Sequence, residues 1–237
     1  MVAAFPRLQK FIAARVSPEG ELGLHLTFGV LVLALAAWAF GGIADEVREA
    51  GPILALDQAV AAWLHARTSA GLTRLALAWT NLHSLAGITL LSVLLGAYFY
   101  RRGARFWLLT LAVAVPGGLL LNVLLKYLFE RARPVSHDAI LSLSTYSFPS
   151  GHTAAATLFY GIIAAYVVCH TDRWPARLAA SVLAALMVVL VGASRIYLGV
   201  HFFSDTLAAV AESCGWLTVC ITAGATLRRR RLGRAAQ

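Results

Sequence analysis

The sequence predicts an all-α, polytopic membrane protein with six transmembrane helices and an interfacial helical segment between the first two. Hydrophobic residues make up 59% of the 237-residue chain and charged residues only 13%, where soluble domains carry about 25% charged residues. Six stretches approach the ~20 apolar residues needed to cross a hydrocarbon core. They are residues 24–44, 82–100, 105–125, 152–170, 177–193 and 206–227. We expect them to form one membrane domain over residues 1–237.

The chain before the first stretch has a mixed character. Over residues 1–22, Arg7, Lys10 and Arg15 alternate with apolar residues, a spacing that predicts a short amphipathic helix on the membrane surface. The stretch 24–44 is too long for a signal-peptide core and lacks a convincing cleavage site. We therefore expect it to be retained as the first transmembrane helix.

The segment 45–80 between the first two spans carries its own pattern. Apolar residues recur at i, i+4, i+7 and i+8, namely Leu56, Val60, Trp63 and Leu64, which predicts a helix with one apolar face. We expect it to lie along the membrane interface, with Trp63 and Trp79 near the headgroups. It could serve as a lid or lipid entrance, or it could be a plain connector, and we favour the connector.

Two polar or helix-breaking features fall inside predicted spans. Pro116-Gly117-Gly118 interrupts the third span and should kink or loosen that helix. Glu212 lies inside the sixth span, where a carboxyl group requires a partner. The sequence does not identify that partner.

The distribution of Lys and Arg predicts the orientation. Of the 20 basic residues, 13 fall on the side that holds both termini and the basic tail 228–237, and 7 fall on the other side. Cytoplasmic loops carry the excess of positive charge. We therefore expect a multi-pass protein of the inner (plasma) membrane with both termini in the cytoplasm.

Polar residues gather at the ends of the later spans. Lys126 closes the third span, Arg133 follows it, Ser150-Gly151-His152 opens the fourth, Arg195 closes the fifth, and His201 and Asp205 mark the start of the sixth. Because an even number of crossings separates these clusters, they fall on the same face of the membrane, which the charge count makes the periplasmic or exterior face.

These residue types suit a phosphate group. Lys126, Arg133 and Arg195 are cations at a water–lipid boundary, where ionisable residues are usually functional. Arginine matches phosphate oxygens with a planar fork, and lysine acts as a point charge. Ser150 and Gly151 at a helix N-terminus offer free backbone N–H groups that favour an anion. Together they predict a cradle for a tetrahedral oxyanion.

The histidines complete a reactive set. If helical, His201 and Asp205 share a face at i and i+4, so the carboxylate can hold one ring nitrogen and leave the other free to attack phosphorus. His152 lies beside the cradle and could protonate the leaving oxygen as a general acid. The three cysteines lack CxxC spacing, so neither a disulfide framework nor a zinc site is indicated.

The same residues resemble the type-2 phosphatidic acid phosphatase superfamily, which also includes vanadium haloperoxidases. Its signature has three parts, K-x6-R-P, P-S-G-H and S-R-x5-H-x3-D. They read here as Lys126 to Arg133-Pro134, Pro149-Ser150-Gly151-His152, and Ser194-Arg195 to His201 and Asp205. The resemblance implies a phosphohistidine on His201, support from Asp205, His152 as the acid, and phosphate contacts from Lys126, Arg133, Ser150, Gly151, His152 and Arg195. It also implies that no metal or cofactor is needed.

The leading hypothesis is a membrane lipid phosphatase that hydrolyses a lipid phosphomonoester or pyrophosphate, with undecaprenyl pyrophosphate, phosphatidic acid, phosphatidylglycerol phosphate and lipid A phosphates as candidates. Phosphoryl transfer to another lipid, anion or lipid transport, and haloperoxidase chemistry are weaker alternatives. The net charge of +9 does not indicate nucleic acid, because the basic residues lie between apolar stretches. The sequence does not indicate an oligomeric state.

Some polar residues receive no functional role. Glu130 and Arg131 are expected to pair with local charges, and His137 and Asp138 are expected to be solvated loop residues. His83 carries no signature that indicates a role.

Overall fold

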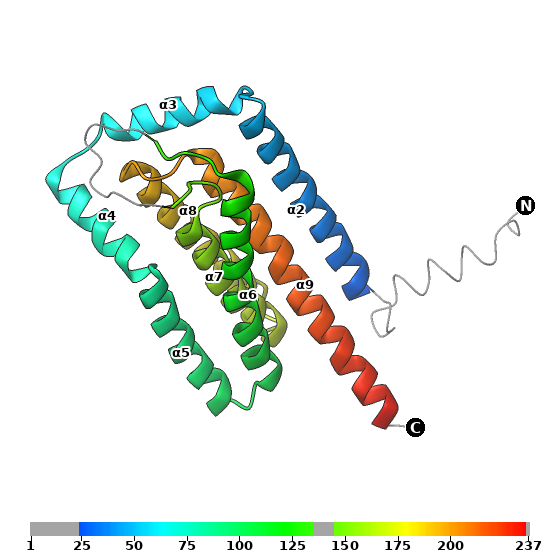
Figure 1. The fold of residues 1–237 in the computed structure, drawn as a ribbon. Helices are drawn as coiled ribbons and strands as arrows, with labels where there is room; N and C mark the ends of the chain where they lie inside the picture. The colour runs from blue at the N-terminus through cyan, green and yellow to red at the C-terminus, as the bar shows by residue number, and fades with distance from the viewer. Residues whose placement is uncertain (1–23, 135–144, 236–237) are drawn as a thin grey trace, which may run out of the picture.

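The structure is a computed structural model that describes residues 24–134 and 145–235. Within these residues, all regular secondary structure is helical (Figure 1). The helices are α2 (Leu24–Arg48), α3 (Ile53–His65), α4 (Ala70–Leu82), α5 (Leu85–Arg101), α6 (Arg105–Phe129), α7 (Gly151–His170), α8 (Trp174–Tyr197) and α9 (Phe203–Ala235). The all-α prediction is confirmed. The predicted surface helix over residues 1–22, together with His137 and Asp138, lies outside the described residues.

The polytopic prediction is also confirmed. Five of the described helices are long and apolar enough to cross a membrane, and a sixth span results if α4 and α5 are counted as one bent helix. The predicted second span, 82–100, corresponds to α5, which has only 17 residues and meets α4 at an angle of 54°. The sequence pattern missed this bend.

The bend between α4 and α5 has a local cause. Ser84 caps α5, because its hydroxyl accepts a hydrogen bond from the N–H of Gly87 at 3.3 Å. A Cβ atom on Gly87 would lie 2.1 Å from the carbonyl oxygen of Leu82. Only glycine therefore fits where the two helices approach so closely.

The helices pack around α7, which contacts α5, α6, α8 and α9. Its small residues Ala154, Ala155 and Ala156 are buried, and Leu158 and Ile162 have no exposed surface. Large apolar side chains on the outer helices remain exposed in the isolated chain, as Trp38 does with 76% of its surface. This distribution is expected where lipid tails cover the outer surface.

Helix α6 continues through Pro116, and a kink or loosening at this position stays a prediction. The two glycines after the proline allow close packing. A Cβ on Gly117 would lie 2.6 Å from the Trp216 ring, and one on Gly118 would lie 2.5 Å from Leu158. Trp216 also donates a hydrogen bond to the carbonyl oxygen of Ala114 at 3.0 Å. Small residues commonly allow such close contacts between membrane helices.

The segment 45–80 forms two helices, of which α3 matches the predicted apolar-faced helix. Figure 1 shows α3 crossing the ends of the helices, with α4 and α5 following along one side. Both α3 and α4 contact α8, and α3 also contacts α9. The segment is therefore packed against the helices that carry the predicted site, and its role as a connector or a lid stays a prediction.

Candidate active site

The predicted site residues lie at one end of the helices, the end that α3 crosses. Lys126 and Arg195 lie in the last turns of α6 and α8, while Gly151 and His152 begin α7 after the N-cap residue Ser150. Asp205 lies in the first turn of α9, His201 precedes that helix, and Arg133 follows α6. A Cβ on Gly192 would lie 3.7 Å from the hydroxyl of Thr153, which shows that the end of α8 packs directly against the start of α7.

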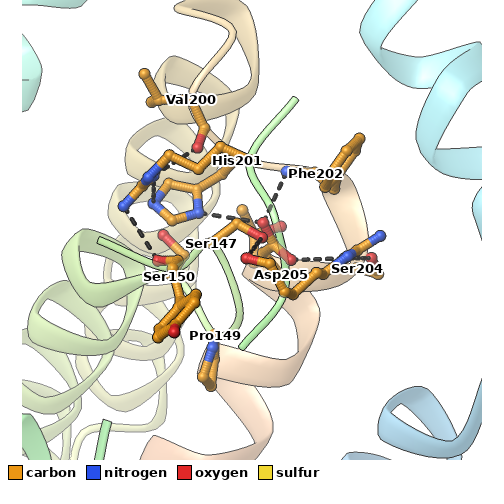
Figure 2. Close-up of polar contacts among 12 residues, drawn as sticks. Ser147, Pro149, Ser150, Val200, His201, Phe202, Ser204 and Asp205 are labelled. Carbon is orange, nitrogen blue, oxygen red and sulfur yellow. Dashed lines mark hydrogen bonds and ion pairs between the residues drawn. The ribbon is translucent and has the colours of Figure 1, made fainter. Parts of the chain in front are cut away.

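His201 and Asp205 form the predicted pair. The Nδ1 atom of His201 lies 3.2 Å from Oδ2 of Asp205, and the same oxygen accepts the N–H of Phe202 at 2.9 Å (Figure 2). Both side chains are buried. Since an ionised carboxylate only accepts, Nδ1 carries the proton in this arrangement. The lone pair of His201 then lies on Nε2.

The second ring nitrogen of His201 accepts a hydrogen bond from a cation, which must be exchanged before this nitrogen can attack phosphorus. Nε2 lies 3.3 Å from Nη1 of Arg133, and burial lowers the pKa of His201 to about 4, although Asp205 counteracts this effect. Burial also lowers the pKa of Arg133. His201 is therefore a neutral imidazole near pH 7, with its nucleophilic nitrogen on the side where Arg133 supplies positive charge.

Arg133 also fastens the polypeptide around the site. Its Nη1 donates to the carbonyl oxygen of Val200 at 2.7 Å, and its Nε donates to that of Thr145 at 2.6 Å. Its Nη2 donates to the hydroxyl of Thr145 and the carbonyl oxygen of Tyr146. Arg133 thus holds the segment before α7 against the turn that carries His201.

Lys126 makes contacts that the sequence did not predict. Its ammonium group donates to the carbonyl oxygens of Tyr146, Ser147 and Pro149 at 2.9, 3.3 and 2.6 Å. An ammonium group has three donors, so all three are used by the backbone that leads into α7. Contact between Lys126 and a phosphate remains a prediction, and it requires the exchange of a carbonyl for a phosphate oxygen.

The prediction that Ser150 offers a free backbone N–H is wrong. That N–H donates to the carbonyl oxygen of Asp205 at 3.0 Å, since the N-cap residue turns back onto the start of α9. The first intrahelical bond runs from Ala154 to the carbonyl of Ser150, so the N–H groups of Gly151 and His152 precede it and have no acceptor within the helix. The Ser150 hydroxyl accepts a bond from Thr153 at 3.0 Å, which leaves its own O–H able to donate.

Arg195 is a buried cation with an incomplete set of partners. Its side chain is only 2% exposed, and Nη1 donates to the hydroxyl of Thr80 on α4 at 2.6 Å. Its Nε has no hydrogen-bond partner among the described residues. Buried guanidinium N–H groups normally have acceptors, so this nitrogen suits an anionic ligand. His152, half-buried at the start of α7, forms no hydrogen bond through its ring within the described part of the chain.

The expectation for Arg131 is wrong, and a site residue was missed with it. Arg131 pairs with no local charge but with Asp57 of α3 at 2.8 Å and with Asp205 at 2.6 Å, each 74 positions away in the sequence. Asp57 also accepts both the N–H and the hydroxyl of Ser204. A single acidic residue in an apolar-faced interfacial helix was the available signal for Asp57.

Two other polar residues have buried partners that the sequence did not reveal. Glu212 accepts a hydrogen bond from the side-chain amide of Asn122 at 2.5 Å. His83 is 1% exposed, with ring nitrogens 2.8 Å from the carbonyl oxygen of Trp79 and 2.9 Å from the hydroxyl of Tyr160. These contacts join α6 to α9 and the end of α4 to α7.

Comparison with known proteins identifies relatives of this chain. The family model of the PAP2 superfamily matches residues 105–229, more than half of the chain. Phosphatidylglycerophosphatase B of Bacillus subtilis (strain 168) is 37% identical over 131 residues, which are 54% of this chain and 63% of the relative, so the match spans less than two thirds of that protein's length.

Two solved structures share the fold. The crystal structure of a transmembrane PAP2-type phosphatidylglycerolphosphate phosphatase from Bacillus subtilis matches with a TM-score of 0.70 and 29% identity, covering 83% of this chain and 96% of that one. The structure of LpxE from Aquifex aeolicus matches with a TM-score of 0.54 and 21% identity over 69% of this chain and 94% of that one. The second likeness concerns the fold alone.

Proposed function

The chain belongs to the PAP2 superfamily, and from this membership and the site geometry we propose that it is a membrane lipid phosphatase that works through a phosphohistidine on His201. The observation that carries the proposal is the buried His201–Asp205 pair at 3.2 Å, whose second ring nitrogen lies 3.3 Å from Arg133. This pairing orients a neutral nucleophile toward positive charge, as attack on a phosphate anion requires.

The proposed reaction has two steps. Nε2 of His201 bonds to phosphorus while the bond to the lipid oxygen breaks. His152 takes up a proton when the phosphate anion binds beside it, because a neighbouring negative charge favours the imidazolium, and it gives that proton to the leaving oxygen. Water then gives a proton to His152 and attacks phosphorus, the P–N bond breaks, and inorganic phosphate leaves. Arg195 and Arg133 stabilise the charge on the phosphoryl oxygens, as do the N–H groups at the start of α7.

The depth of the site favours a lipid substrate. Lys126, Arg195 and Asp205 lie within one turn of the ends of helices long enough to span a bilayer, which is the depth of lipid headgroups. We propose a phosphomonoester or pyrophosphate of a lipid as the substrate. Phosphatidylglycerol phosphate leads the candidates because the curated Bacillus subtilis relative and the Bacillus subtilis structure are both named for it, followed by phosphatidic acid and undecaprenyl pyrophosphate.

Phosphate release by purified protein in detergent tests this proposal. Wild type and His201→Ala are assayed on the three lipids, with and without EDTA. His170→Ala is the matched control, because His170 is an exposed residue at the opposite end of α7. We expect release by wild type and His170→Ala in either buffer, and a loss of at least about 10²-fold for His201→Ala.

Turnover retained by His201→Ala would overturn the histidine mechanism, and loss of wild-type activity in EDTA would contradict its independence of metal. Brief incubation with radiolabelled lipid should leave an acid-labile label on wild type and none on His201→Ala. Label that ends on a second lipid rather than in free phosphate would identify a transferase.

A further inference from the structure

We infer that Arg131, held by Asp57 of α3, is a positioning residue that fixes the Asp205–His201 pair for attack. The inference rests on the proposed function and adds two residues that the sequence motifs do not specify. It also gives α3 a part in the reaction.

Arg131 fixes the carboxylate that orients the nucleophile. Oδ2 of Asp205 is occupied by Nδ1 of His201 and the N–H of Phe202, while Oδ1 accepts Nη1 of Arg131 at 2.6 Å. With a separate partner on each oxygen, the carboxylate cannot rotate without losing a hydrogen bond. The orientation of the His201 ring therefore depends on Arg131 as well as on Asp205.

Asp57 fixes Arg131 and the start of α9 together. Its carboxylate accepts Nη2 of Arg131 at 2.8 Å, the N–H of Ser204 at 2.7 Å and the hydroxyl of Ser204 at 2.6 Å. The N–H of Ser204 lies in the first turn of α9, where backbone donors lack partners within the helix. A carboxylate from α3 thus caps the helix that carries Asp205, and its charge suits the helix dipole there.

The network is shielded from water. The side chains of Asp57 and Asp205 are 1% and 0% exposed and that of Arg131 is 11% exposed. The ring of Phe202 lies 4.2 Å from the guanidinium carbon of Arg131. One guanidinium thus serves two buried carboxylates, and removal of one partner of a buried ion pair is strongly destabilising because it leaves an unpaired charge.

Arg131 acts on the far side of Asp205 from the reacting nitrogen. The charged groups that act on His201 are Asp205, Lys126 and Arg133, and Arg131 reaches the ring only through Asp205. Loss of Arg131 should therefore lower kcat with little change in KM. It should also remove the positive charge that offsets the carboxylate of Asp205. The carboxylate would then favour the imidazolium form of His201 more strongly, which shifts the acid limb of kcat/KM to higher pH.

The test uses Arg131→Gln and Asp57→Asn in the full-length protein in detergent, on the lipid that wild type hydrolyses. Arg67→Gln is the matched control, since Arg67 is exposed and its guanidinium lies over Trp63 in the α3–α4 connection. We expect kcat to fall about 10- to 100-fold in both test variants, by analogy with partners that orient metal-binding histidines. Inhibition by inorganic phosphate should change less than threefold, a margin of about 0.7 kcal/mol. In Arg131→Gln, the acid limb of kcat/KM should move to higher pH.

Unchanged kcat and an unchanged acid limb in folded Arg131→Gln would overturn the inference, and so would a rise in KM and in the phosphate inhibition constant at constant kcat. If Arg131→Gln does not fold, Arg131→Lys takes its place: restored folding with kcat still reduced supports positioning, and full kcat contradicts it. Absence of turnover in wild type, or full turnover in His201→Ala, would instead defeat the proposed function.

Discussion

The residues of the site differ in how much hydrogen-bonding capacity they have left for a substrate. Lys126 donates to three backbone carbonyls, and Arg133 contacts three residues besides His201. Arg195 by contrast makes one hydrogen bond, to Thr80, and keeps a buried Nε without a partner in the described chain. We therefore expect Arg195 to contribute more to phosphate binding than its position in the motif alone indicates.

Arg195→Lys tests this expectation. Lysine preserves the positive charge but cannot present the planar fork or donate at the Nε position. We expect kcat/KM to fall about 10²-fold, a loss similar to the removal of one oxyanion donor. Arg177→Lys is the control, because Arg177 lies on the same helix and pairs with the exposed Asp172 at the opposite end. A loss below about threefold in Arg195→Lys, matched by the control, would contradict a direct role.

The pH profile follows from the burial of His201. Since burial lowers its pKa to about 4, the ring is neutral above that pH and loses its nucleophilic lone pair as the pH falls below it. We expect the acid limb of kcat/KM that arises from the enzyme to lie near pH 4 rather than near pH 6.5. A limb that is due to substrate ionisation changes its pH when a monoester is replaced by a pyrophosphate, whereas a limb that is due to His201 keeps the same pH with both substrates. An enzyme limb near pH 6.5 would show that His201 is more solvated than the structure indicates.

At the scale of helices, the segment 45–80 makes hydrogen bonds to the ends of α8 and α9. Asp57 on α3 caps α9, and Thr80 on α4 accepts from Arg195. The hydroxyl of Tyr197 at the end of α8 contacts Ser69 and Thr73 at the start of α4. The short helices thus set the positions of the ends of α8 and α9, where the site lies.

Gly87→Ala should disturb this support. A Cβ there would meet the backbone oxygen of Leu82 at 2.1 Å, and backbone cannot yield as a flexible side chain would. We expect a loss of about 1–3 kcal/mol in stability, with reduced activity because the bend also places Thr80 beside Arg195. Gly71→Ala is the control, since nothing lies within 4 Å of its Cβ position. Thermal unfolding in detergent measures the stability of both variants. Equal unfolding midpoints for Gly87→Ala and Gly71→Ala would show that the bend tolerates a side chain.

Residues with local sequence relationships could be predicted. His201 and Asp205 are four positions apart, and their contact was predicted on the condition that both lie in a helix. The structure has the contact at 3.2 Å, although His201 precedes α9 and only Asp205 is helical. Long apolar runs likewise predicted the spans. Asp57 and Arg131 are 74 positions apart, and no periodicity relates an interfacial helix to a loop after α6. Their contact depends on tertiary packing.

The bend at Gly87 was missed for a different reason. An apolar run gives the length of a span but not its direction, and the bend depends on a backbone approach between Leu82 and Gly87. Similarly, the N–H of Ser150 was predicted to be free because helix N-termini usually have free donors. The carbonyl of Asp205, 55 positions later in the chain, accepts it.

At the scale of the whole molecule, the basic residues are distributed unequally between the two ends. At the end that holds the site, Lys126, Arg131, Arg133 and Arg195 all make internal hydrogen bonds. Among the described residues, the exposed arginines at that end are Arg48, Arg67 and Arg74, and those at the opposite end are Arg101, Arg102, Arg105, Arg173, Arg228 and Arg230. Exposed cations, which can interact with the translocation machinery and anionic lipids, are therefore more numerous opposite the site, and this predicts a cytoplasmic location for that end.

Cysteine labelling tests this orientation. In a variant with Cys169, Cys214 and Cys220 replaced by alanine, single cysteines are introduced as Glu49→Cys and Asp172→Cys, which are exposed at the site end and the opposite end. A membrane-impermeant maleimide should label Glu49→Cys in intact spheroplasts and label Asp172→Cys only after permeabilisation, because the charge asymmetry predicts that the site lies outside. The reverse pattern would place the site in the cytoplasm, where a lipid phosphate would have to arrive from the inner leaflet. Both variants must retain lipid phosphatase turnover, so that the labelled population is the folded enzyme.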